Sequence, residues 1–141
     1  MRIRHALTLL LCAAVSWSSA CTITGLRHEV TFMPGSAVLQ AAEIRSLTDW
    51  YVNMRDDPRI DFVLVHAYSI KGNAASTKLT RARANAVAEL ARTLGASDEA
   101  PVNMFLKGVE TPRPETYQEV VVSINPKCAR TNSCCPQPVQ K

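Results

Sequence analysis

The stretch 59–94 constrains the fold most, because two different periodicities follow one another in it. In residues 60–69, apolar side chains occupy both alternating faces, which predicts a strand inside a sheet. A short polar segment that contains Gly72 predicts a loop. Over residues 77–94 apolar side chains recur at helical spacing, and Gly95 is expected to end that helix. The apolar positions of the expected helix are Leu79, Ala86, Val87, Leu90 and Leu94.

Arg83 lies inside this apolar stripe, whereas Arg81 and Arg92 fall on the opposite side of the helix. A buried guanidinium is costly unless its charge is paired or reaches an opening. One interpretation is an arginine that packs its stem and pairs with a nearby carboxylate. The other is a group that receives an anion where the strand, loop and helix meet, since the planar guanidinium suits a carboxylate.

The rest of the chain predicts an α+β domain over residues 29–125. Strands are expected at 29–33, 102–106 and 117–124, with a loop at 108–116. Ser36 is expected to cap a helix that runs to about Arg55. The order of elements fits two helices on one face of the sheet.

The chain of 141 residues is long enough for one domain with one sizeable core. Its formal charge of +4 falls to +2 without Arg2 and Arg4, so charge alone does not suggest nucleic acid as a partner. We find no phosphate loop, no paired catalytic carboxylates and no partner for His66 at a recognisable spacing. We therefore expect neither an enzyme nor a cofactor.

The N-terminus has the pattern of an export signal over residues 1–20, with a basic start, a short apolar run and small residues before Cys21. This arrangement resembles a bacterial lipoprotein signal, which implies lipidation of Cys21 and a leash over residues 21–28. Thr22 after the cysteine resembles sorting to the outer membrane. Plain cleavage after Ala20 is the alternative, and it would leave Cys21 free or in a disulfide.

The segment 126–141 is expected to be an irregular tail outside the core, with three cysteines and no periodicity. In an oxidising compartment Cys128 can pair with Cys134 or with Cys135, which leaves one thiol. A zinc site is the other interpretation of these thiols. No histidine lies near them, and their spacing matches no zinc pattern, so we expect no metal.

Two runs resemble the OmpA/MotB-like C-terminal domain, a peptidoglycan-associating family. Residues 32–39, Phe-Met-Pro-Gly-Ser-Ala-Val-Leu, are similar to its opening motif, and residues 79–84, Leu-Thr-Arg-Ala-Arg-Ala, to its Leu-Ser-x-x-Arg-Ala. The resemblance covers most of residues 29–125 and implies a βαβαβ-type sandwich, with two helices on one face of a mixed sheet. It also implies that Arg83 grips the diaminopimelate of a peptidoglycan stem peptide. The residues expected around that ligand are Arg83, Ser69, Tyr68, Gly72, Asn73 and Leu79.

The chain departs from the family in the loop after the strand, where an aspartate should stand. Ser69 occupies that position if Gly72 is aligned with the family glycine, and Tyr68 occupies it without a gap. Two functions follow as expectations. The first is an outer-membrane lipoprotein on the periplasmic face that associates with peptidoglycan. The second is an assembly lipoprotein of a trans-envelope secretion or conjugation machine, with a degenerate peptidoglycan pocket and other machine proteins as partners.

Overall fold

A computed structural model of the chain describes residues 26–55, 60–96, 100–110, 118–131 and 133–134. Within these residues two long helices alternate with the first three strands, a fourth strand follows, and a short 3-10 helix comes after it. The elements are β1 (Arg27–Thr31), α2 (Ala41–Arg55), β2 (Ile60–Ile70), α3 (Ala74–Thr93), β3 (Val102–Val109), β4 (Glu119–Pro126) and η3 (Lys127–Thr131). This composition confirms the predicted α+β class.

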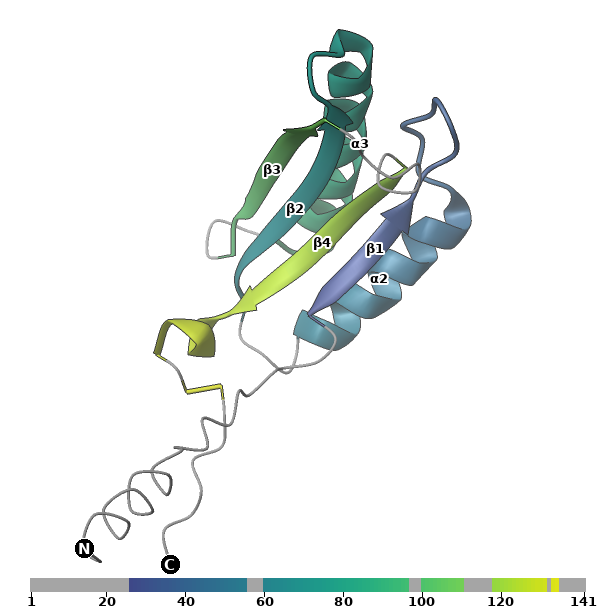
Figure 1. The fold of residues 1–141 in the computed structure, drawn as a ribbon. Coiled ribbons are helices and arrows are strands. Elements are labelled where there is room, and N and C mark those ends of the chain that lie inside the picture. The colour runs from purple at the N-terminus through teal and green to yellow at the C-terminus, as the bar shows by residue number, and fades with distance from the viewer. Residues whose placement is uncertain (1–25, 56–59, 97–99, 111–117, 132, 135–141) are drawn as a thin grey trace, which may run out of the picture.

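The strands form one mixed sheet in the order β1-β4-β2-β3. β4 pairs antiparallel with both β1 and β2, and β2 pairs parallel with β3 (Figure 1). Ala67 illustrates the register, because it lies opposite Val120 of β4 on one side and Leu106 of β3 on the other. β2 is therefore an interior strand, as its sequence predicts.

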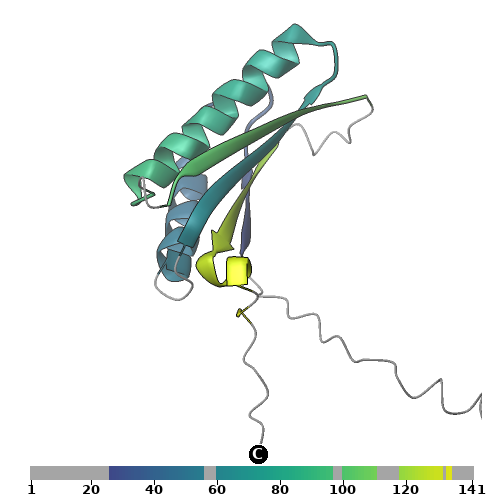
Figure 2. The same cartoon turned by 90° about the vertical axis from the view of Figure 1, so that its left-hand side faces the viewer.

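Both helices cover the same face of the sheet, and Figure 2 shows them together on one side of it. The core lies between these two layers, which confirms the predicted arrangement. Side chains that face the opposite side of β2, among them Phe62, Leu64, His66 and Tyr68, are half-buried. The buried core consists of Val30, Phe32, Leu47, Tyr51, Val63, Val65, Ala67, Ala84, Val87, Ala88, Val120, Val122 and Ile124.

α3 packs on the sheet through smaller side chains than the sequence pattern predicts. Its buried positions are Thr80, Arg83, Ala84, Val87, Ala88 and Ala91, whereas Leu79, Leu90 and Leu94 are half-buried at the margins. Small side chains on the inner face let a helix backbone approach its neighbour closely, and the leucines then cover the flanks. The stripe predicted from the sequence follows the larger apolar residues of α3, whereas the face that is buried follows the smaller ones.

Gly95 ends α3 as predicted. Its φ of +114° is a conformation that side-chain-bearing residues rarely adopt. The N–H of Gly95 donates to the carbonyl of Arg92, and the N–H of Ala96 donates to that of Ala91, each at 3.1 Å. These two bonds form a Schellman motif, which satisfies carbonyl groups that the end of a helix leaves open.

Several boundaries differ from the predicted ones. α2 begins at Ala41 and not directly after Ser36, whose side chain accepts a hydrogen bond from the N–H of Val38 in a turn that precedes the helix. β3 continues to Val109, since its parallel pairing with β2 extends through Gly108, which the sequence placed in a loop. β1 begins at Arg27 within the expected leash, and the tail contains η3, where no element was expected.

Candidate functional site

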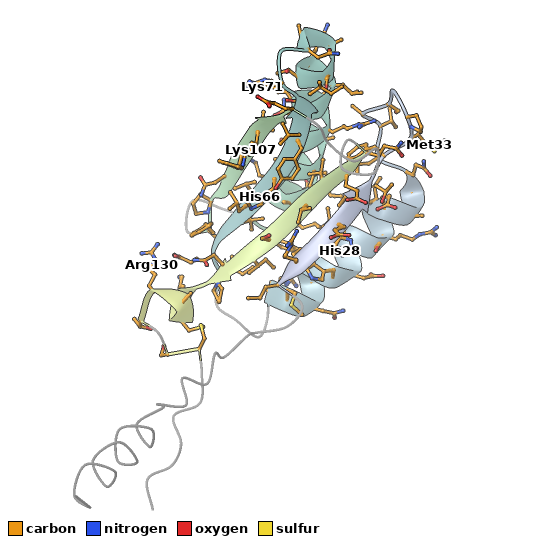
Figure 3. The ribbon with its side chains drawn as sticks, in the orientation of Figure 1. His28, Met33, His66, Lys71, Lys107 and Arg130 are labelled. Atoms are coloured by element: carbon orange, nitrogen blue, oxygen red, sulfur yellow. A yellow bond between two sulfur atoms is a disulfide. The ribbon has the colours of Figure 1, made fainter. Side chains whose placement is uncertain are left out.

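β1, β2 and β3 all finish at the same end of the sheet, because β1 and β3 both run parallel to β2. We call this end, with the segments that follow these strands, the loop end. Lys71, just after β2, donates its N–H to the carbonyl of Val109, and its ammonium contacts Glu110 at 2.7 Å. Figure 3 shows Lys71 and Met33 at the loop end and Arg130 at the opposite end. The residues that the resemblance assigns to a ligand belong to the loop end.

The turn between β2 and α3 is closed by hydrogen bonds from its own side chains. Asn73 caps α3, and its Oδ1 accepts from the N–H of Ser76 at 2.9 Å. The hydroxyl of Ser76 accepts from the N–H of Ile70 at 2.9 Å, which ties the helix start back to the strand. Gly72 has a φ of +77°, which the turn requires. Of the expected ligand residues, Gly72 and Asn73 thus shape this turn.

α3 begins three residues earlier than predicted, at Ala74, and this changes which backbone donors are open. With the helix start predicted at Thr77, we expect the N–H groups of residues 76–79 to be open and to assist in binding a ligand. Ser76 instead donates to the Asn73 side chain, and Thr77 donates to the Asn73 carbonyl at 3.0 Å. That expectation is therefore wrong for both residues.

Arg83 is only 3 % exposed and lies on the inner face of α3. Its Nε donates to the carbonyl oxygen of Ser36 at 2.6 Å, and its Nη2 donates to that of Met33 at 2.9 Å. The guanidinium carbon also lies 5.3 Å from the centre of the Phe32 ring, within the range of a cation–π contact. Burial lowers the pKa of Arg83 below its ordinary value. The charge is thus held by the segment that follows β1.

Two acceptors of Arg83 are backbone carbonyls, those of Met33 and Ser36, and neither sequence interpretation of this arginine includes them. Met33 and Ser36 were missed as partners of the arginine. Both residues lie in the motif at residues 32–39. That motif indicates a resemblance to the family, but it does not indicate a contact with Arg83. Carbonyl acceptors leave no trace in side-chain chemistry, so the sequence could not identify them.

Ser69 and Tyr68 point to opposite faces of the sheet, because successive residues of a strand alternate. Ser69 is 6 % exposed and lies on the face that α3 covers, the face that also holds Arg83. Tyr68 is half-buried on the uncovered face, and its carbonyl accepts from the Thr80 hydroxyl at 2.9 Å. Of the two alternatives for the missing aspartate, Ser69 therefore shares a face with Arg83. Leu79 lies half-buried on α3, one position before Thr80.

The tail is closed by a disulfide between Cys128 and Cys134, one of the two pairings that the sequence left open. It does not lie wholly outside the core as expected, because Arg130 forms an ion pair with Asp61 of β2, which is buried. Cys21 and Cys135 lie outside the described residues, as does the export signal. In the described part of the chain, no helix combines the length and apolarity needed to span a membrane.

Neither a scan against protein-family models nor a comparison with curated proteins found a match. The fold does match solved structures. The OmpA-like domain of FopA1 from Francisella tularensis subsp. tularensis SCHU S4 is 24 % identical, with a TM-score of 0.53 over 74 % of this chain and 80 % of that one. The C-terminal domain of Helicobacter pylori MotB is 11 % identical, with a TM-score of 0.56 over 77 % of this chain and 98 % of that one.

A third similar structure is the peptidoglycan-associated lipoprotein from Burkholderia pseudomallei. It is 16 % identical, with a TM-score of 0.50 over 68 % of this chain and 86 % of that one. These identities are low, so the similarity establishes the arrangement of the elements. The chain therefore has the OmpA-like fold, shared with the C-terminal domain of MotB.

Proposed function

We propose that this chain is a non-enzymatic protein of the cell envelope, an outer-membrane lipoprotein that associates weakly with peptidoglycan stem peptides. The observation that carries the proposal is the position of Arg83, a buried cation at the loop end of an OmpA-like fold. A guanidinium recognises a carboxylate through paired, charge-assisted hydrogen bonds. The diaminopimelate of a stem peptide offers a carboxylate beside an ammonium group, so Arg83 would accept the former.

The weakness of the proposed binding follows from Ser69. A hydroxyl can accept a hydrogen bond from the ligand's ammonium but carries no charge. Replacing the carboxylate by a hydroxyl keeps a hydrogen bond to the ammonium but loses the attraction between two opposite charges, a loss of about 1.5–3 kcal/mol. The difference corresponds to one to two orders of magnitude in affinity, at about 1.4 kcal/mol per factor of ten. We therefore expect binding to stem peptides that is weak but measurable.

The direction of the strands supports this assignment of the loop end. The carbonyl of Leu26, at the start of β1, accepts from the N–H of Ile124 near the end of β4, so the described chain begins beside η3. Cys21 precedes Leu26 by five residues, so a lipid on it would tether the domain at the end opposite to the loop end. In that orientation the loops face away from the membrane and toward the wall.

A second function is favoured by the hydrogen bonds of Arg83. Because Ser36 and Met33 accept from Nε and Nη2, a ligand carboxylate that approaches this edge of the guanidinium would have to compete with two backbone carbonyls. An arginine used in this way serves the fold, and the loop end would then be a degenerate pocket. The chain would act as an assembly lipoprotein of a trans-envelope secretion or conjugation machine, and its partners would be other proteins of that machine.

Sedimentation with purified peptidoglycan sacculi separates the two functions. The chain from residue 22 onward is compared with Ser69→Asp, which restores the acid on the face that holds Arg83. We expect weak binding of the wild type, binding about tenfold or more tighter for Ser69→Asp, and competition by free diaminopimelate. Asn85→Asp is the matched control, because it adds the same charge at an exposed position of α3.

If neither the wild type nor Ser69→Asp sediments with sacculi, peptidoglycan binding is excluded and the assembly function takes its place. Arg83→Ala is a less suitable variant on its own, because it also removes the hydrogen bonds to Met33 and Ser36. Its loss of binding is interpretable only at a temperature at which circular dichroism shows the variant to be folded.

A further inference from the structure

Asp61 is an acidic side chain in a place that favours apolar ones. It is 6 % exposed and lies on the same face of β2 as Val63. The register between β2 and β4 shifts at this point, between the pair Ile60–Pro126 and the pair Phe62–Asn125. A buried carboxylate is destabilising unless a cation or several donors reach it. The tail supplies such a cation.

Arg130 of η3 donates from Nε to Oδ2 of Asp61, although the two residues are 69 positions apart. Its side chain is 71 % exposed, so the ion pair joins a surface cation to a buried acid. Two residues before Arg130, Cys128 begins the disulfide to Cys134, with a sequence separation of 6. Arg130 therefore lies within a loop that the disulfide closes, which we call the tail loop.

The tail loop also has hydrogen bonds of its own, and they converge on one atom. The carbonyl oxygen of Cys128 accepts from the N–H of Ser133 at 3.1 Å and from the hydroxyl of Thr131 at 3.2 Å. The Thr131 and Ser133 hydroxyls are 2.6 Å apart. These bonds and the disulfide together restrict the backbone on both sides of Arg130.

We propose that the Cys128–Cys134 disulfide and the Arg130–Asp61 ion pair form a redox-coupled clamp. Closing the tail loop reduces the number of conformations open to Arg130, so less entropy is lost when its side chain reaches the carboxylate. The coupling is reciprocal by thermodynamic linkage, and the ion pair in turn stabilises the disulfide. Reduction frees the tail loop, weakens the ion pair and leaves a buried carboxylate poorly compensated at the start of β2.

The redox step is a thiol–disulfide exchange with an external dithiol. A thiolate of the dithiol attacks one sulfur of the tail loop, which forms a mixed disulfide and releases the other cysteine as a thiolate. The second thiol of the reductant then displaces the first cysteine, so that two electrons and two protons reach the tail and the reductant leaves as a disulfide. Arg130, Thr131 and Ser133 are exposed, so the tail loop is open to such a reagent.

Amide hydrogen exchange at residues 60–63 tests the coupling. The chain from residue 22 onward carries Cys135→Ser in every sample, so that only the tail loop responds to dithiothreitol. We expect exchange at residues 60–63, relative to residues 84–88 of α3, to become about fivefold faster on reduction, a factor that corresponds to about 1 kcal/mol. The oxidised Arg130→Met variant should already show the faster exchange, and reduction should change it less than twofold.

Two further variants complete the test. Lys127→Met is the matched control, because it removes a neighbouring exposed cation of η3, and it should respond to reduction as the wild type does. Arg130→Lys keeps the charge and should restore part of the protection in the oxidised protein. The proposal is overturned if reduction accelerates exchange equally in the wild type and in Arg130→Met, or if it leaves the wild type unchanged.

Discussion

Arg83 and Ser36 are joined by a hydrogen bond of 2.6 Å from the guanidinium Nε to the backbone carbonyl oxygen, across 47 positions of the sequence. The bond fixes the segment between β1 and α2 against the inner face of α3. Arg83, which the sequence suggests for ligand binding, thus also holds two segments of the fold together at the same end of the molecule. Its contribution to stability has to be measured before its contribution to binding is interpreted.

We expect Arg83→Met to lower the free energy of unfolding by about 3 kcal/mol, because it removes two charge-assisted hydrogen bonds and leaves two carbonyls without this donor. Arg81→Met is the matched control, since Arg81 is exposed on the same helix, and it should change stability by less than about 0.5 kcal/mol. Urea titration with linear extrapolation measures both values. Equal effects of the two substitutions would show that the bonds to Met33 and Ser36 do not stabilise the fold.

Stability should fall as the pH decreases through the range in which histidine titrates. Burial lowers the pKa of His28, while Glu43 and Glu29 act in the opposite direction. Burial, with Arg27 in addition, lowers the pKa of His66. The unfolded chain therefore binds more protons below about pH 6.5, so the stabilisation is complete above that pH and is lost toward pH 5.

Urea midpoints at pH 7.5 and pH 5.5 test this expectation. The wild type should be less stable at the lower pH, and the double variant His28→Gln, His66→Gln should show a smaller difference between the two conditions. A wild type that gains stability at pH 5.5 would contradict the lowered pKa values. An equal pH dependence in the double variant would assign the effect to other groups.

Gly95→Ala should destabilise the domain by about 1–2 kcal/mol, because an alanine at a φ of +114° is strained. Gly108→Ala is the control, since Gly108 has no positive φ and an added Cβ would meet Lys71 at 3.4 Å, an ordinary contact. Thermal unfolding of the two variants gives the comparison. If both substitutions have the same effect, the cost does not come from the end of α3.

Cys21→Ser should move the protein from the membrane fraction to the soluble periplasm. The expectation rests on the basic start, the apolar run and the small residues before Cys21. Mass spectrometry of the N-terminal peptide should show an acylated cysteine in the wild type. An unmodified peptide, together with unchanged fractionation of the variant, would favour simple cleavage after Ala20.

The sequence predicts most of the architecture because its periodicities report burial directly. The alternation in β2 and the stop at Gly95 both arise from residues close together in the chain, so their patterns survive in a single sequence. Ser36 was assigned wrongly as a helix cap for the opposite reason. Its carbonyl accepts from Arg83 of a distant helix, a contact that local propensity does not describe, and its side chain bonds to Val38 in a turn before α2.

The tail is the clearest case of a long-range contact that the sequence does not predict. Three cysteines indicate a disulfide, but no local pattern connects Arg130 to an acid 69 positions earlier. Asp61 also lies on the face of β2 that carries buried valines. A carboxylate at such a position does not indicate which residue pairs with it. Contacts of this kind depend on the register between β2 and β4, which only the folded sheet defines.

The order of the strands has a consequence for how this protein is made. Of the strands that the structure describes, β4 is the last to be synthesised, yet it lies between β1 and β2 and pairs with both. A nascent chain that stops before Glu119 leaves β1 without its neighbour in the sheet and exposes one long edge of β2. The sheet can close only after β4 has emerged, so the appearance of residues 119–126 sets the earliest time at which the sheet can form. Until then, the open edges require protection from pairing with other chains.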